Sequence, residues 1–197
     1  RPISLARMDD LAVERFMISF GHDPSMVLSM NIDASIIGQA TRSDHLISLV
    51  NSHNLDSRRV VLEIIESKVA DPKYLHDFAK KVREYGFLVG LDDMGAGHSN
   101  LDRIPLIKPD IIKIDKYLVR NLDEDYYKRM VLSSMVNLAR QTGAIVVAEG
   151  IETEQESIEL LFEGVDFQQG YYFSKPAPLD KQQSFKLNGQ VETVTQD

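Results

Sequence analysis

The sequence contains no cysteine among its 197 residues and no tryptophan. Without cysteine the chain can form neither disulfide bonds nor thiolate metal sites, and it has no cysteine nucleophile. Any metal site must therefore be built from oxygen and histidine ligands. The absence of cysteine also fits a reducing compartment, and we expect the protein in the cytoplasm.

Basic residues and long apolar runs are scarce as well. Lysine and arginine number 22 against 30 aspartates and glutamates, which gives a formal net charge of −8. This balance argues against the broad basic face that duplex nucleic acid requires. No stretch approaches the roughly 18 consecutive apolar residues of a membrane span, and no signal peptide is recognisable. The negative net charge does not exclude a small anionic ligand, which could bind through a metal ion.

The length and the hydrophobic content of 43% predict one domain with a sizeable core. We place this domain at residues 1–180 and expect a polar tail or linker at 181–197, where the sequence is polar and weakly periodic. The chain begins with Arg1 rather than Met, and we expect both ends to continue in a longer protein.

Apolar periodicity predicts strands and helices that alternate along the chain. Predicted strands lie at 26–31, 59–66, 87–91, 111–115, 144–150 and 167–173, and predicted helices at 8–20, 43–52, 72–86, 125–142 and 153–162, with a helical turn at 99–104 that Pro105 ends. This alternation is typical of a parallel α/β sheet, either open and doubly wound or closed into a barrel. Polar residues at nearly every strand end favour the barrel, in which all strand ends meet at one mouth. About six of eight strands are recognisable, so the barrel is expected to be incomplete at its N-terminal end.

The centre of this pattern is the apolar run 87–91, followed by Asp92, Asp93 and two glycines. Taken alone, the acid pair could cap a helix or shape a turn. Similar positions on other strands also carry polar side chains, namely Asn31, Glu63, Lys113, Glu149 and Gln169. Each has an ordinary alternative as a solvated strand-end acid, a surface cation, a turn residue or a backbone-bonding amide. His98 is expected to be a loop residue.

Together these residues predict a site made of hard oxygen ligands. Carboxylates and an amide suit Mg²⁺ or Mn²⁺, and the number of ligands fits two ions. A two-metal clamp suits in-line attack of water on a phosphodiester. In that chemistry Lys113 would steady the attacking oxygen or a phosphate.

Five segments of the chain resemble, in order, the motifs of EAL-domain cyclic di-GMP phosphodiesterases, a family of bacterial signalling enzymes. They are LEIIES at 62–67, LDDMGAGHS at 91–99, IKID at 112–115, VAEGIET at 147–153 and QGYYFSKP at 169–176. The resemblance covers residues 26–180. It implies a modified TIM-type (β/α) barrel that hydrolyses cyclic di-GMP to linear pGpG with Mg²⁺ or Mn²⁺.

The resemblance also implies a role for each matched residue. Asn31, Glu63 and Asp92 resemble metal ligands, and Asp93 resembles the ligand that completes a second metal site. Lys113 and Gln169 resemble residues that orient the attacking water. Glu149 resembles an acid that serves as a second-metal ligand or as the general base, and Glu152 resembles a nearby supporting acid. Glu66 resembles the residue that anchors the loop after Asp93. Because the family uses that loop for dimer contact, a homodimer is expected, with other signalling domains in the full-length protein.

The sequence departs from the family in two ways. The Glu-Ala-Leu signature, whose glutamate is a metal ligand, occurs nowhere in these residues, and Met94 and Ala96 stand where the family usually has Phe and Thr. The alternative to an active enzyme is therefore a catalytically impaired domain that serves as a cyclic di-GMP receptor or a protein-interaction module. Without the resemblance, a third interpretation would be a barrel that stabilises an enolate on Mg²⁺.

Overall fold

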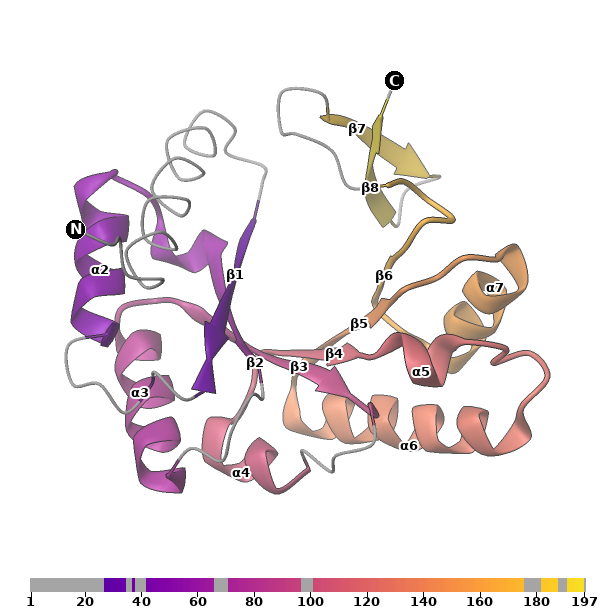
Figure 1. Ribbon diagram of the computed structural model, residues 1–197, viewed down its shortest axis with the longest axis horizontal. Helices are drawn as coiled ribbons and strands as arrows, with labels where there is room; N and C mark the ends of the chain where they lie inside the picture. The colour runs from indigo at the N-terminus through magenta and orange to yellow at the C-terminus, as the bar shows by residue number, and fades with distance from the viewer. Residues whose placement is uncertain are drawn as a thin grey trace, which may run out of the picture. The chain divides into compact units, whose positions relative to one another are not determined.

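The computed structural model describes residues 27–34, 37, 42–65, 71–96, 101–175, 182–187 and 191–196. The predicted helix at 8–20, Glu66 and His98 lie outside these residues. The chain divides into two compact units, and the division falls within one strand: the first unit reaches Gly90 and includes 105–107, and the second holds 91–104 and the chain from 108 onward. Figure 1 labels the elements of both units.

The first unit is built from parallel strands and two helices. Its elements are β1 (Leu28–Asp33), α2 (Arg42–Ser52), the 3-10 helix at Ser57–Arg59, β2 (Val60–Ile65), α3 (Pro72–Glu84) and the start of β3 (Leu88–Met94). Residues 60–64 of β2 are all buried, as expected for a strand that is covered on both faces. The helix α3 begins with Pro72, and the Asp71 side chain caps it by accepting from the Lys73 N–H at 2.8 Å. Its buried face consists of Leu75, Phe78, Ala79 and Val82.

The second unit continues the same alternation. Its elements are the rest of β3, the 3-10 helix Leu101–Arg103, β4 (Ile111–Ile114), α5 (Lys116–Val119), α6 (Tyr126–Thr142), β5 (Ile145–Glu149), α7 (Glu154–Glu163), β6 (Phe167–Gln169), β7 (Gln182–Leu187) and β8 (Val191–Gln196). The short helix α4 (Ile104–Ile107) is divided between the two units. Asp125 caps the start of α6, and Gly143 ends that helix in the left-handed conformation at φ 77°. α6 packs against α7 and β5.

The six strands β1 to β6 form a sheet in chain order, with β1 and β6 as its edges among the described strands. β1 pairs with β2, β4 with β5, and β5 with β6, each in parallel. The order is linear rather than a closed ring in the part of the chain that the structure describes. The predicted α/β fold of an incomplete barrel is confirmed.

Several element bounds differ from the predicted ones. β1 continues to Asp33, so Asn31 lies within the strand and not at its tip. Pro105 lies in the first turn of α4 instead of ending a helix, because the first turn has no intrahelical partner for the N–H that proline lacks. β6 ends at Gln169, since the chain then turns: the N–H groups of Phe173 and Ser174 both donate to the Gly170 carbonyl oxygen.

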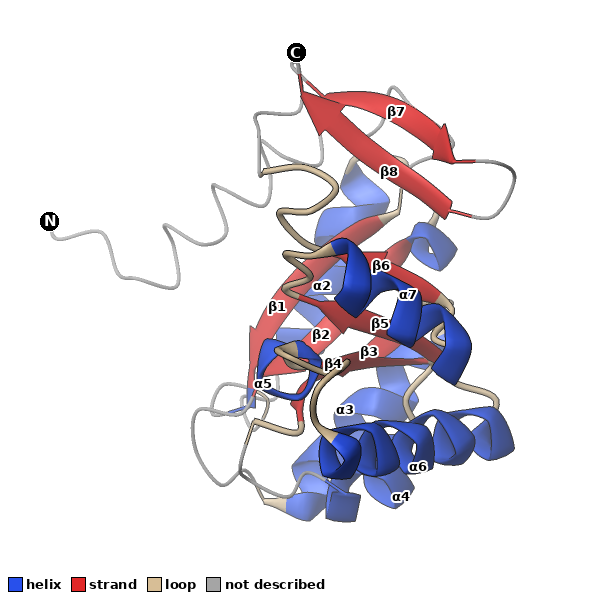
Figure 2. Ribbon diagram, turned by 90° about the vertical axis from the view of Figure 1, so that its right-hand side faces the viewer, coloured by secondary structure: helices blue, strands red, loops and turns tan. Residues whose placement is uncertain are grey.

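Residues beyond 180 contain two strands that the sequence pattern did not predict. β7 and β8 pair with each other in antiparallel register, from Gln182 opposite Gln196 to Leu187 opposite Val191 (Figure 2). The domain boundary at residue 180 stays a prediction. In the described residues, no helix has the length and hydropathy that crossing a membrane demands.

Candidate functional site

Three predicted site residues of the second unit come together at the carboxyl ends of β3, β4 and β5. The Lys113 ammonium nitrogen lies 2.6 Å from Glu149 Oε1 and 3.2 Å from Asp92 Oδ1. These side chains are poorly exposed, at 12% for Lys113, 11% for Asp92 and 25% for Glu149. Parallel strands that end at the same edge explain the meeting, since Lys113 and Glu149 belong to the directly paired strands β4 and β5. One ammonium thus balances two carboxylates that would otherwise repel each other.

Asp93 has an unusual backbone conformation. Its φ of 56° is left-handed, which aspartate tolerates better than most residues, and its N–H donates to Asp92 Oδ1 at 3.0 Å. Burial raises the pKa of the Asp93 carboxyl, and the nearby charges of Asp92 and Asp115 raise this pKa further, against an opposing effect of Lys113 and Lys116. The surroundings of Asp93 therefore disfavour its charged form relative to an aspartate in water.

Replacement of Asp93 by asparagine is expected to stabilise the fold near neutral pH when no divalent metal is present. An acid whose folded pKa lies above its unfolded value stabilises the fold below the unfolded pKa, and this contribution is lost as the pH rises through the folded pKa. Asparagine removes the cost of the charge and also accepts a positive φ. Asp93→Asn should therefore unfold at a higher temperature than the original chain at pH 7 with a chelator present, and this gain should disappear below about pH 4.

Asp123→Asn is the matched control for Asp93→Asn, because it removes the same charge from an exposed turn residue. We expect little change in its unfolding temperature at either pH. Equal or lower stability of Asp93→Asn at pH 7 would contradict the raised pKa of Asp93.

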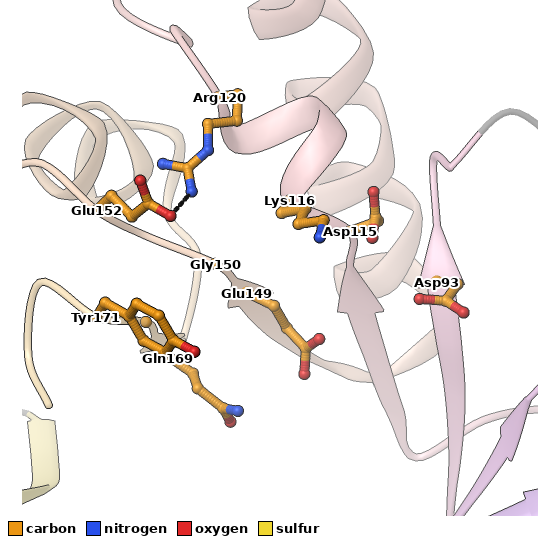
Figure 3. A pocket seen from close by; sticks show the side chains of 10 residues that line it. Asp93, Asp115, Lys116, Arg120, Glu149, Gly150, Glu152, Gln169 and Tyr171 are labelled. Atoms are coloured by element: carbon orange, nitrogen blue, oxygen red, sulfur yellow. Dashed lines mark ion pairs between the residues drawn. The ribbon is translucent and has the colours of Figure 1, made fainter. Parts of the chain in front are cut away.

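A cavity of about 440 Å³ lies in the second unit, and Asp93 and Glu149 form part of its wall (Figure 3). Glu149 and Gln169 lie opposite each other in the register of β5 and β6, and both side chains reach toward it. Arg120 and Glu152 form an ion pair on another part of its wall. The full lining is Asp93, Asp115, Lys116, Arg120, Glu149, Gly150, Glu152, Gln169, Gly170 and Tyr171. The structure thus places four predicted residues, Asp93, Glu149, Glu152 and Gln169, around one polar cavity.

Four charged or aromatic residues of the lining were not predicted from the sequence. Asp115 and Lys116 directly follow β4, and Tyr171 closely follows β6. Their short distance from a strand end could have predicted that they line the cavity. Arg120 follows the short helix α5, and no sequence pattern indicated that it would reach the cavity.

Gly150 allows the loop after β5 to approach α5 closely. Its φ is 72°, and a Cβ built there would lie 2.5 Å from the Cβ of Lys116. Only glycine combines this left-handed conformation with so short an approach. The contact fixes the spacing between two segments of the cavity wall, the one that follows Glu149 and the one that carries Lys116.

In the first unit, the predicted ligands Asn31 and Glu63 lie opposite each other in the register of β1 and β2. Glu63 is buried and accepts a hydrogen bond from Ser29 Oγ, whereas Asn31 is exposed. Gly90 leaves room for Glu63, since a Cβ at residue 90 would lie 3.2 Å from Glu63 Cγ. Their role as metal ligands stays a prediction. Among the described residues, no three acids or histidines stand close enough together to hold a metal ion.

Comparison with known proteins assigns the family. The EAL domain matches residues 4–176, most of the chain, so the chain belongs to the EAL domain family and the resemblance seen in the sequence is confirmed. Among curated relatives, the probable cyclic di-GMP phosphodiesterase PdeB of Escherichia coli K12 is 32% identical over 155 residues, which is 79% of this chain and 29% of that protein. The chain thus spans less than a third of PdeB.

Solved structures of the family have the same fold. The complex of Klebsiella pneumoniae BlrP1 with calcium and cyclic di-GMP matches with a TM-score of 0.79 and 28% identity, over 87% of this chain and 44% of that one. An EAL domain protein of Listeria monocytogenes matches with a TM-score of 0.81 and 28% identity, over 90% of this chain and 71% of that one. BlrP1 has also been solved with manganese and cyclic di-GMP, at a TM-score of 0.80 and 28% identity, over 87% of this chain and 45% of that one.

Proposed function

We propose that this chain is the phosphodiesterase domain of a bacterial signalling protein and hydrolyses cyclic di-GMP to linear pGpG with Mg²⁺ or Mn²⁺. The observation that carries the proposal is the Lys113 ammonium between the carboxylates of Asp92 and Glu149, of which Glu149 also lines the polar cavity. The family supports the substrate, since PdeB is named for this activity and BlrP1 has been solved with cyclic di-GMP.

The donor set of the second unit fits a divalent cation. Asp92, Asp93 and Glu149 offer hard oxygen atoms, and the pKa of Asp93 is raised by burial and by the charges of Asp92 and Asp115. A cation would relieve this crowding of negative charge, so we propose that Asp92, Asp93 and Glu149 contribute metal ligands in this unit, although no three acids among the described residues lie close enough to share one ion in the absence of metal. The family resemblance predicts Asn31 and Glu63 as further metal ligands. When bound, Mg²⁺ or Mn²⁺ supplies a Lewis acid for the phosphate and lowers the pKa of a water molecule.

The protein side chains would carry the rest of the reaction. The oxygen of water bonds to phosphorus, the bond from phosphorus to the ribose O3′ breaks, and O3′ takes up a proton, which leaves linear pGpG. As the alternative to its role as a metal ligand, Glu149 would act as the general base that takes the proton of the attacking water. Lys113 would hold the attacking oxygen or a phosphate oxygen, and Gln169, opposite Glu149 in the register, would orient the water.

The proposal is tested by incubating the chain with cyclic di-GMP and Mn²⁺ and identifying the product by mass spectrometry. We expect pGpG in the presence of Mn²⁺ and none with excess chelator. The Asp92→Asn variant should turn over at least about 10- to 100-fold more slowly, because even residues that only support metal ligands contribute that much. Asp123→Asn should match the original rate. Turnover that is unchanged in Asp92→Asn would exclude Asp92 as a ligand.

The second candidate function is a receptor that binds cyclic di-GMP without hydrolysing it, or a protein-interaction module. The sequence favours it in one respect, since the Glu-Ala-Leu tripeptide that supplies a metal ligand in the family is absent from these residues. Binding measured by calorimetry without any pGpG formation would establish the receptor. From the family resemblance we also propose a cytoplasmic homodimer.

A further inference from the structure

Two adjacent polar residues in the first turn of α7 are buried. Glu156 is 2% exposed and Ser157 is 8% exposed. A buried carboxylate is costly unless hydrogen bonds compensate the loss of water. The partners of these two side chains therefore show what they hold in place.

The Glu156 carboxylate joins two segments of the cavity wall. Its Oε2 accepts from the N–H groups of Glu152 at 2.8 Å and of Thr153 at 3.2 Å, in a capping box that starts α7. Its Oε1 faces the Asn121 N–H at 3.4 Å and Arg120 Nη1 at 3.5 Å. The two oxygens thus connect the loop after β5 with the end of α5. Glu152 and Arg120, which both line the cavity, are the residues at these two ends.

Ser157 holds the neighbouring strand. Its Oγ donates to Gln168 Oε1 at 2.7 Å, and Gln168 Nε2 donates to the Ser157 carbonyl oxygen at 3.0 Å. Gln168 directly precedes Gln169 of the cavity. The first turn of α7 therefore holds three segments of the cavity wall in place: the loop after β5, the end of α5, and β6.

We propose that Glu156 is a positioning residue, which holds Arg120 as the group that binds a phosphate of the ligand. The substrate class rests on the proposed function. One Nη of Arg120 pairs with Glu152, as Figure 3 shows, and the other faces buried Glu156, so the guanidinium plane is oriented from two sides. Glu152 is 51% exposed and its pairing is correspondingly weak, so a phosphate can displace it. A guanidinium binds phosphate oxygens through parallel N–H donors, and Lys116 adds a second cation to the wall.

The Glu156→Gln variant separates the two functions of the carboxylate, which are to cap the start of α7 and to orient Arg120. A glutamine keeps one oxygen for the Glu152 and Thr153 N–H groups, as capping boxes with glutamine do. Its amide NH₂ then faces the Asn121 N–H and Arg120, which are donors as well, so Arg120 loses its buried partner and keeps only the exposed pairing with Glu152. We expect cyclic di-GMP to bind about tenfold more weakly, which is typical of one lost charge-assisted hydrogen bond, with kcat changed less than KM.

Two comparisons show whether Glu156 acts through Arg120. Arg120→Ala should weaken binding at least as much, and the double variant should bind no more weakly than Arg120→Ala alone. Thr153→Ala is the matched control, because Thr153 Oγ1 accepts from the Glu156 N–H at 3.2 Å and forms the other half of the capping box. It should lower the unfolding temperature and leave the affinity for cyclic di-GMP unchanged.

The outcomes separate this inference from the proposed function. Binding by the original chain without hydrolysis, with weaker binding in Glu156→Gln, would refute the phosphodiesterase and support the positioning role. Hydrolysis by the original chain, with an unchanged KM in Glu156→Gln, would support the phosphodiesterase and refute the positioning role of Glu156. Equal losses of affinity in Thr153→Ala and Glu156→Gln would reduce Glu156 to a structural residue and overturn the inference. A chain that neither binds nor hydrolyses cyclic di-GMP would overturn both.

Discussion

Lys113→Met is expected to reduce the turnover of cyclic di-GMP by at least about 100-fold, the typical effect of removing one preorganised donor from an active site. Methionine has a similar length but no charge, so Asp92 and Glu149 would face each other without the ammonium that lies 3.2 Å and 2.6 Å from them. The effect on turnover is measured at saturating Mn²⁺, so that weaker metal binding does not account for it.

The same variant should also lose stability. Removal of one partner from a poorly exposed ion pair typically costs about 3 kcal/mol, or a decrease of roughly 6 to 12 °C in the unfolding temperature of a domain of this size. Lys80→Met on the exposed face of α3 is the matched control and should change neither quantity. A rate for Lys113→Met within a factor of ten of the original would show that the lysine has a structural role only.

Gly170→Ala is expected to have the largest effect on the fold among single substitutions at the cavity. A Cβ at residue 170 would lie 2.1 Å from the Ile151 carbonyl oxygen and 2.3 Å from the Ile151 nitrogen, and backbone atoms cannot give way as a flexible side chain can. The same backbone connects the loop after β5 to β6, because the Ile151 N–H donates to the Gln169 carbonyl oxygen at 3.2 Å and the Tyr172 N–H to the Ile151 carbonyl oxygen at 3.0 Å. These two segments would have to separate.

We expect Gly170→Ala to lose about 3 kcal/mol in the free energy of unfolding, at the upper end of the range for overpacking. Turnover should fall with it, since Gln169 and Tyr171 flank the substituted residue. Gly143→Ala separates lack of space from backbone strain. Gly143 has a φ of 77°, but no atom lies within 4 Å of the position that a Cβ would take there, so its substitution should cost only about 1 kcal/mol. Equal losses in denaturant unfolding of the two variants would contradict the steric argument.

The fold was largely predictable because its signals are local. The run of apolar residues in β2 and the proline that starts α3 each specify their element without help from the rest of the chain. The end of β6 was not predictable in this way. The aromatic residues after Gly170 have strand propensity, but the chain turns there because residue 170 lies against the backbone of Ile151, a contact distant in sequence.

The candidate site was predictable where its residues are attached to strand ends. Lys113 and Glu149 follow this rule, and the structure places them in contact. Arg120 and Glu156 do not follow it. Arg120 follows a four-residue helix, and Glu156 lies within α7 behind the cavity, so their roles depend on how helices pack. The sequence pattern predicted the site residues at strand ends, but it predicted neither Arg120 nor Glu156, which supports Arg120.

Two ion pairs, one in each unit, differ in how dissolved salt should affect them. Arg58 and Asp56 on the first unit pair at 2.8 Å with side chains 80% and 39% exposed, so mobile ions reach them freely. Lys113 and Asp92 are 12% and 11% exposed, and partly buried pairs are screened much less. Raising the ionic strength should therefore weaken the surface pair and leave the arrangement of Asp92, Lys113 and Glu149 intact. The contacts among these three side chains should accordingly persist at ionic strengths that weaken the pair of Arg58 and Asp56.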